Sequence, residues 1–225
     1  MAKPILLIIM ISILVVPSLK GQSQKLDSLK QIALTYFQKN DFVNAEKQFE
    51  KIYLVDSLDV DVVFNLGTLN LQLDNEKDAI KYFQKAVSLR DRESAKILKK
   101  NLNQKIEYSD FMHTDDVDKQ PKCIYKNKEL DLIENHNLNS KLISIITKGL
   151  RKSKIIKDSN FSGRVYVMIE IDKSGKIICQ IKKGTDSEEV NSEIKQIIEN
   201  SGLFIPAKYQ NKDVGVWGWT IPISI

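Results

Sequence analysis

Apolar and polar residues alternate along much of the last third of the chain, which is the pattern of strands with one buried face. In residues 163–172 the apolar positions are Val165, Val167, Ile169 and Ile171. A polar turn follows, in which Gly175 is free to take a positive φ. The return strand continues the same face with Ile177, Cys179 and Ile181. This stretch is therefore predicted to be an antiparallel hairpin.

Helical spacing precedes and follows the hairpin. Before it, apolar residues recur at intervals of three and four, at Leu138, Leu142, Ile145, Ile146 and Leu150. Asn137 and Asn139 are the candidate N-caps of that helix. After the hairpin, residues 186–201 carry a second such stripe, formed by Val190, Ile194, Ile197 and Ile198. Both helices are expected to cover the apolar face of the hairpin.

The chain ends in a third alternating stretch. One face holds Trp217, Trp219, Ile221, Ile223 and Ile225, and the other holds Val214 and Val216. So many large apolar residues predict a strand of the core. Together the three strands and two helices predict an α+β unit, a three-stranded antiparallel sheet with two helices on one face.

Three short motifs mark the turns of this unit. They are G-x-V-x-V-x-x-x-I-D-x-x-G-K-I from Gly163 to Ile177, F-x-P-A from Phe204 to Ala207, and the polar turn from Tyr209 to Lys212. In this order they resemble the C-terminal domain of TonB, the energy transducer of the bacterial envelope. In that family the domain engages the short N-terminal box of outer-membrane receptors by adding that peptide to its last strand.

The resemblance implies a candidate peptide-binding edge in the last strand, made of Asp213, Val214, Gly215, Val216, Gly218 and Thr220. An unpaired strand edge offers N–H and C=O groups that a guest strand satisfies without a pocket. Gly215 and Gly218 are expected to let a second backbone approach closely. Trp217 and Trp219 are expected in the core.

The first half of the chain contains an internal repeat with a period of 34 residues. Small residues and an aromatic residue recur in register: Ala33 with Gly67, Ala45 with Ala79, Phe49 with Phe83, and Ile52 with Ala86. Small residues let two antiparallel helices approach closely, and the aromatic ring fills the space beside them. The period and this order resemble the tetratricopeptide repeat. Tyr36 fits that family's tyrosine position, whereas Asn70 departs from it.

Residues 25–106 are therefore predicted to form two tetratricopeptide repeats and a capping helix. The stripe of the capping helix is Ala95, Leu98, Leu102 and Ile106. An array this short is expected to dock on a neighbouring domain or to self-associate. Residues 107–120 are acidic and poor in apolar residues, and they are predicted to be a linker in which His113 is solvated. The TonB-like domain is then expected over residues 121–225, with Pro121–Tyr125 as a short extended piece.

The N-terminus has the pattern of an export signal. Lys3 precedes an apolar run from Ile5 to Val16, and the chain turns polar before residue 22. That run is shorter than a membrane-spanning helix requires. Residues 1–21 are therefore expected to be a cleaved signal peptide, which places the folded part in the periplasm. The alternative is an uncleaved inner-membrane anchor at residues 4–19, as in TonB.

The distribution of charge adds little to these predictions. Residues 22–118 carry 14 Lys/Arg against 17 Asp/Glu, and residues 119–225 carry 18 against 12. The basic half suits an acidic partner or an anionic surface, or is a solvated surface. No basic patch with interleaved aromatic residues suggests nucleic acid. The chain has two histidines and two cysteines, without metal spacing, a nucleophile–base pair or a Gly-rich loop. No enzymatic activity, cofactor or small-molecule substrate is expected.

Cys123 and Cys179 leave two interpretations open. Export would place them in an oxidising compartment, where a disulfide between them would persist and stabilise the fold. Buried free cysteines, which behave as small apolar residues, are the alternative.

These expectations combine into an exported, periplasmic adaptor for protein–protein interactions, engaging TonB-dependent outer-membrane receptors by strand addition. Two alternatives stand beside it. One is a membrane-anchored energy transducer of the TonB type. The other is a repeat scaffold for envelope assembly or secretion, with no role in transport.

Overall fold

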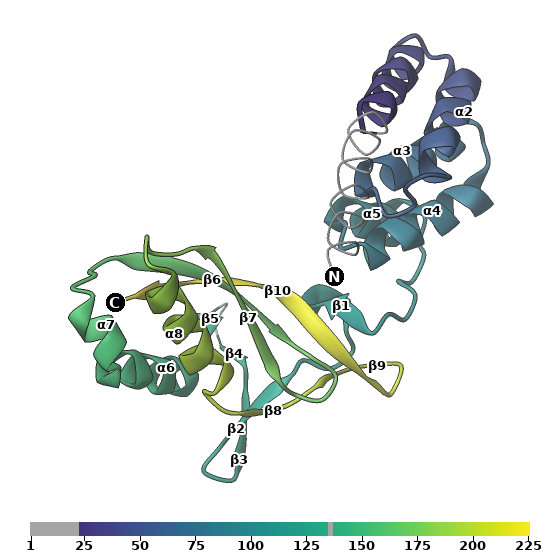
Figure 1. Cartoon of the computed structure of the whole chain (residues 1–225). Helices are drawn as coiled ribbons and strands as arrows, with labels where there is room; N and C mark the ends of the chain where they lie inside the picture. The colour runs from purple at the N-terminus through teal and green to yellow at the C-terminus, as the bar shows by residue number, and fades with distance from the viewer. Residues whose placement is uncertain (1–22, 135–136) are drawn as a thin grey trace, which may run out of the picture. The chain divides into compact units, whose positions relative to one another are not determined.

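A computed structural model describes residues 23–134 and 137–225. The chain divides into two compact units between Ile106 and Glu107 (Figure 1). The N-terminal unit is helical, and the C-terminal unit combines sheets with helices, so the prediction of a helical array followed by an α+β unit is confirmed. The signal peptide and the alternative anchor lie outside the described residues. Among the described residues, no helix has the length and apolar character needed to cross a membrane.

The N-terminal unit consists of successive antiparallel helices. Residues 23–38 are helical, and the elements that follow are α2 (Phe42–Tyr53), α3 (Val60–Gln72), α4 (Glu76–Ser88), α5 (Arg92–Lys96) and the π-helical turn η1 (Ile97–Asn101). Asp41, Asp59 and Asp91 cap three of the helices through hydrogen bonds from backbone N–H groups. Polar residues form the turn within each helix pair, where Asn40 and Asp74 take positive φ.

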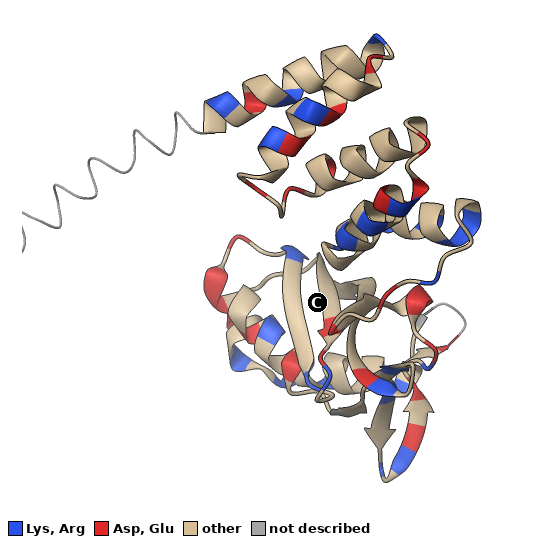
Figure 2. Cartoon of the chain, turned by 90° about the vertical axis from the view of Figure 1, so that its right-hand side faces the viewer, with Lys and Arg blue, Asp and Glu red and all other residues tan. Residues whose placement is uncertain are grey.

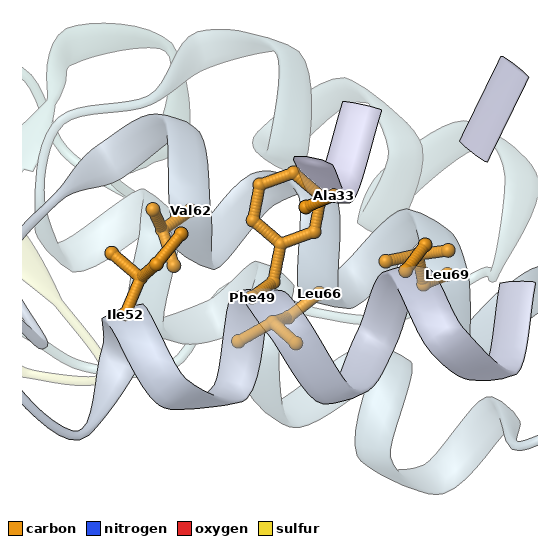
Figure 3. Packing of buried hydrophobic residues seen from close by; sticks show 7 residues of the cluster. Ala33, Phe49, Ile52, Val62, Leu66 and Leu69 are labelled. Atoms are coloured by element: carbon orange, nitrogen blue, oxygen red, sulfur yellow. The ribbon is translucent and has the colours of Figure 1, made fainter. Parts of the chain in front are cut away.

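Phe49 lies at the centre of the core shared by the first helix, α2 and α3. Its ring points toward Ala33 in Figure 3, and only 2% of it is exposed. The other buried members are Ala45, Ile52, Val62, Leu66 and Leu69. In the second repeat, a Cβ atom at Gly67 would lie 2.7 Å from the ring of Phe83. The small–aromatic pairing expected from the sequence is therefore the actual contact between the helices.

Asn70, which occupies the position of the family's tyrosine, is buried in a polar network. Its side-chain amide donates to Glu46 Oε1 at 2.8 Å and to the carbonyl of Leu66 at 2.9 Å. Its Oδ1 atom accepts from Asn75 Nδ2 at 2.9 Å. The network links α2, α3 and the turn before α4, so hydrogen bonds stabilise this position in place of an aromatic ring.

We expect Glu46→Gln to stabilise the N-terminal unit at neutral pH. Burial, followed by the neighbouring Glu50 carboxylate, raises the pKa of Glu46 above its ordinary value. Since the folded state then holds this proton more tightly than the unfolded state, stability falls as the pH rises through the raised pKa. Glutamine removes the charge and keeps an oxygen that accepts from Asn70. Thermal melts followed by circular dichroism should show a higher Tm at neutral pH and no gain below the ordinary carboxyl pKa; an equal gain at both pH values would contradict the explanation.

The C-terminal unit is built on a five-stranded sheet with strand order β1-β10-β6-β7, in which β9 also pairs with β10. The strands are β1 (Phe111–His113), β6 (Arg164–Ile171), β7 (Ile177–Lys183), β9 (Ala207–Tyr209) and β10 (Lys212–Ser224). The helices are α6 (Ser140–Lys152), α7 (Lys154–Asp158) and α8 (Glu188–Glu199). α8 packs on β7, and both α6 and α7 contact α8. Of the two candidate caps, Asn139 is the N-cap of α6.

A second, three-stranded sheet has the order β3-β2-β8. Its strands are β2 (Lys122–Tyr125), β3 (Lys128–Asp131) and β8 (Leu203–Ile205). A two-stranded pair, β4 (Ile133–Glu134) and β5 (Asn137–Leu138), precedes α6. The prediction of a single three-stranded sheet was therefore incomplete, because Pro121–Tyr125 and Phe204–Ala207 contribute to further strand pairs.

Two sequence-based expectations about this unit are wrong. Residues 107–120 are not a linker, since β1 pairs in parallel with Gly215–Trp217, and the 3-10 turn η2 (Thr114–Asp116) follows it. Met112 is buried at the centre of β1.

The second error concerns the faces of β10. Val216 pairs with Ile171 and Trp219 pairs with Ile169, with a register shift between them. Since Ile169 and Ile171 share one face of β6, Val216 and Trp219 also share a face. A strictly alternating strand would place them on opposite faces, which is what the sequence had suggested.

Candidate peptide-binding edge

The first four residues of the predicted edge are already paired within the chain. Asp213 and Val214 pair with β9, and Gly215 pairs with Phe111 of β1. Val216 pairs with Met112 on one side and with Ile171 on the other, so both of its edges are occupied. Each of these four residues therefore already has a strand partner within the chain, and at Val216 neither side is free for a guest strand.

The two glycines of this stretch accommodate the chain's own side chains. A Cβ atom at Gly215 would lie 2.8 Å from the Phe111 ring. At Gly218, where φ is +132°, it would lie 2.7 Å from Nε2 of His113. The ring of His113 also packs edge-on against Trp217, with centroids 4.8 Å apart. His113 is therefore a packing residue rather than the solvated one that was expected, and the close approach at both glycines is made by the segment around β1.

The segment around β1 is held by a small charged cluster. The ammonium of Lys173 lies 3.1 Å from Oδ2 of Asp110, and the hydroxyl of Tyr108 donates to Oδ1 of Asp110 at 3.0 Å. The hydrogen bond from Lys173 holds the pKa of the Asp110 carboxyl below its usual value. Lys212 lies 4.9 Å from the centroid of the Tyr108 ring. These contacts connect the residues before β1 to the β6–β7 turn and to β10.

The remaining part of β10, Trp219–Ser224, pairs with β6 alone among the described strands. Ile225 exchanges both backbone hydrogen bonds with Gly163, at 3.0 and 3.3 Å. Because backbone groups alternate in direction along an antiparallel strand, Ile223 and Ile221 also face β6. Thr220, Pro222 and Ser224 therefore direct their backbone groups away from it. We call this side of Trp219–Ser224 the open edge.

The other margin of the sheet, β7, is partly closed. The backbone N–H of Cys179 donates to Oε1 of Glu199, from α8, at 3.1 Å. This donor faces away from β6, so the carboxylate occupies one of the positions at which an added strand would pair. The same bond supports the direction assigned to β10, because Ile169, the partner of Cys179, must then direct its backbone groups toward Trp219.

Both cysteines are buried and free. Cys123 lies in β2 of the three-stranded sheet, and Cys179 lies in β7 of the five-stranded sheet. Each thiol is thus enclosed in a different sheet, an arrangement that corresponds to the second interpretation, two buried free cysteines. Burial raises the pKa of the Cys123 thiol. Burial and the nearby Glu199 carboxylate raise the pKa of Cys179 to about 12.

Other surface features of the two units are less specific. A cavity of about 350 Å³ near the β2–β3 hairpin is lined in part by Tyr125, Leu130 and the three lysines Lys126, Lys128 and Lys141. Among the described residues, no group of three or more His, Cys, Asp or Glu side chains could hold a metal ion. Figure 2 shows acidic and basic positions interspersed along the helices of the N-terminal unit, which fits a solvated surface.

The helical array exposes apolar side chains at the connection between its two repeats. Leu54 is 85% exposed, and Val55 and Leu58 are also exposed. The first helix also exposes two apolar side chains, Ile32 at 43% and Leu34 at 38%. The buried α3 residues Val62, Leu66 and Leu69 correspond, at a shift of 34, to Ser28, Ile32 and Thr35, and all three of these are exposed.

Comparison with known families bears on the N-terminal unit. Residues 60–92 match the family described as tetratricopeptide repeat, and this stretch contains α3 and α4. No curated protein and no solved structure matches the chain. The N-terminal unit is thus a helical array with a tetratricopeptide repeat, the class of architecture that generally mediates protein–protein interactions.

Proposed function

We propose that the protein is an exported adaptor whose C-terminal unit binds an extended peptide from an envelope protein along the open edge of β10. The observation that carries the proposal is the direction of Thr220 and Ser224. Both present a backbone N–H and a C=O group that no described strand pairs with. A guest strand would satisfy these groups by backbone pairing and would need no deep pocket.

The TonB-like motifs indicate which class of partner the C-terminal unit would bind. Gly163–Ile177, Phe204–Ala207 and Tyr209–Lys212 support a TonB-like identity for the C-terminal unit. In that family the guest is the N-terminal box of an outer-membrane receptor. The apolar run from Ile5 to Val16 supports export, and the helical array would contribute a second protein-binding surface. The proposal assigns the chain no catalytic step and no cofactor.

An array of immobilised peptides that cover the N-terminal segments of outer-membrane receptors tests the proposal. The purified protein should bind a subset of these peptides. Thr220→Pro should weaken binding about fivefold, because one backbone donor toward the guest is lost while pairing with β6 is unaffected. Thr220→Ala, which keeps the N–H group, is the matched control and should bind like the unsubstituted protein. Equal binding by the proline and alanine variants would rule out pairing at this edge.

The membrane-anchored alternative predicts a different mature N-terminus. Mass spectrometry of the first peptide of the protein purified from cells distinguishes the two forms. A peptide beginning near Gln22 supports the exported adaptor, and one that retains residues 4–19 supports an anchored energy transducer.

A further inference from the structure

Pro222 lies in the middle of a sheet strand, where proline is normally excluded. Its ring nitrogen cannot donate to a neighbouring strand, so proline is found in sheets on edges whose N–H would face solvent. Pro222 pairs with Tyr166 of β6 in the register, and it is one of the residues whose backbone faces away from β6. The proline therefore costs the sheet none of its own hydrogen bonds. It removes one donor from the open edge.

We propose that Pro222 prevents the open edge from pairing with the same edge of a second copy of the chain, and so reserves that edge for a different, extended peptide. The inference rests on the proposed function for the identity of the guest. It adds a residue that determines which kind of strand the edge accepts.

Pairing of the open edge with itself leaves more backbone groups without a partner than pairing with a guest peptide does. When two copies of the open edge lie side by side and antiparallel, each contributes Thr220, Pro222 and Ser224. Every pairing of the two proline-containing stretches lacks a donor from each copy, and each missing donor leaves a carbonyl of the neighbour unpaired. A guest peptide without proline supplies its own full set of donors, so only the single donor at Pro222 is missing. The open edge is therefore expected to pair less stably with the same edge of a second copy than with a guest peptide that lacks proline.

The rest of the five-stranded sheet fits this interpretation. At β7, the carboxylate of Glu199 accepts the outward N–H of Cys179. On the side of β10 away from β6, β1 covers Gly215–Trp217, and η2 follows directly after it. Both margins of the sheet thus carry a feature that limits unwanted strand pairing. At the open edge, Pro222 removes a single donor and leaves the other backbone groups free to pair with a guest strand.

Sedimentation velocity over a wide range of concentration tests the proposal on the purified protein. Pro222→Ala restores one donor in each copy, so the dimerisation constant should tighten at least about tenfold relative to the unsubstituted protein. The peptides that bind the unsubstituted protein should bind the variant about fivefold more tightly. Thr220→Ala, on the same edge, should leave self-association unchanged. The double variant Pro222→Ala with Thr220→Pro should lose the gain, since a donor is again missing.

The outcomes separate this inference from the proposed function. If Pro222→Ala associates no more than the unsubstituted protein, the role of Pro222 is wrong, even where peptides bind. If Pro222→Ala self-associates and no receptor peptide binds either protein, then Pro222 does prevent pairing between copies, and the proposed guest is wrong. Self-association that persists in the double variant would place the contact elsewhere and would overturn the inference.

Discussion

Replacing Gly175 by alanine should lower the free energy of unfolding of the C-terminal unit by about 3 kcal/mol. Gly175 has a φ of +82°, which L side chains rarely adopt, and an added Cβ atom would overlap the carbonyl oxygen of Phe204. That oxygen belongs to the backbone of β8, so it cannot rotate away as a side chain would. The substitution therefore has two effects at once: it strains the β6–β7 turn, and it displaces β8.

Tryptophan fluorescence measures this effect selectively, because Trp217 and Trp219 are the only two tryptophans of the chain and both lie in β10. The urea midpoint of the fluorescence transition should fall clearly for Gly175→Ala. Gly202→Ala is the matched control, since its nearest contact would be an ordinary 3.7 Å and its φ is not positive. If both variants unfold at the same midpoint, the turn does not limit the stability of this unit.

Phe49→Ala should destabilise the N-terminal unit by about 3–5 kcal/mol. The ring is buried among Ala33, Ile52 and Leu66, and its removal leaves a cavity between helices that are too short to be stable alone. Far-ultraviolet circular dichroism, which is dominated by the helices, should show an earlier loss of signal on denaturation.

Val43→Ala, on the same helix but 49% exposed, is the control for Phe49→Ala and should change stability by no more than about 0.5 kcal/mol. The tryptophan transition of the C-terminal unit is expected to stay in place in both variants. A Phe49 variant that unfolds like the Val43 variant would mean that the aromatic position of the repeat carries no packing energy.

Regular periodicity decided which parts of the fold could be predicted from the sequence. The period of 34 located the helix pairs because small and aromatic residues must meet at the same place in every repeat, as Gly67 and Phe83 do. Strict alternation likewise located β6 and β7, whose inward residues are largely buried. In both cases the residues that form the periodic pattern are the same residues that make the tertiary contacts, so the pattern is enough to predict the element.

The parts that were missed have no such period. β1 is three residues long, and no alternation can be recognised in Phe111–His113; its place is fixed by the space that Gly215 and Gly218 leave on another strand. The irregularity of β10 is not marked by a sequence pattern either, since Gly218 is compatible with a regular strand as well as with a bulge. Only pairing with β6 shows which applies.

The free edge lies further along β10 than the sequence predicts, at Trp219–Ser224, and this too has no periodic pattern. The alternation of apolar residues identifies the last strand, but sheet order decides which of its edges is free. β1 and β9 cover Asp213–Val216 from opposite ends of the C-terminal unit's sequence. Pro222 was the one local signal for the open edge, because proline inside a strand marks a backbone position that faces away from its neighbours.

Because the two thiols are enclosed in different sheets, they could serve as separate reporters of partial opening. Alkylating reagents attack the thiolate, and a thiol with a pKa of about 12 supplies almost none at neutral pH while Cys179 stays buried. Modification therefore requires that the sheet around the sulfur opens. Brief exposure to such a reagent at rising denaturant, followed by peptide mapping, would give one unfolding curve for Cys123 and another for Cys179, and so the order in which the two sheets come apart.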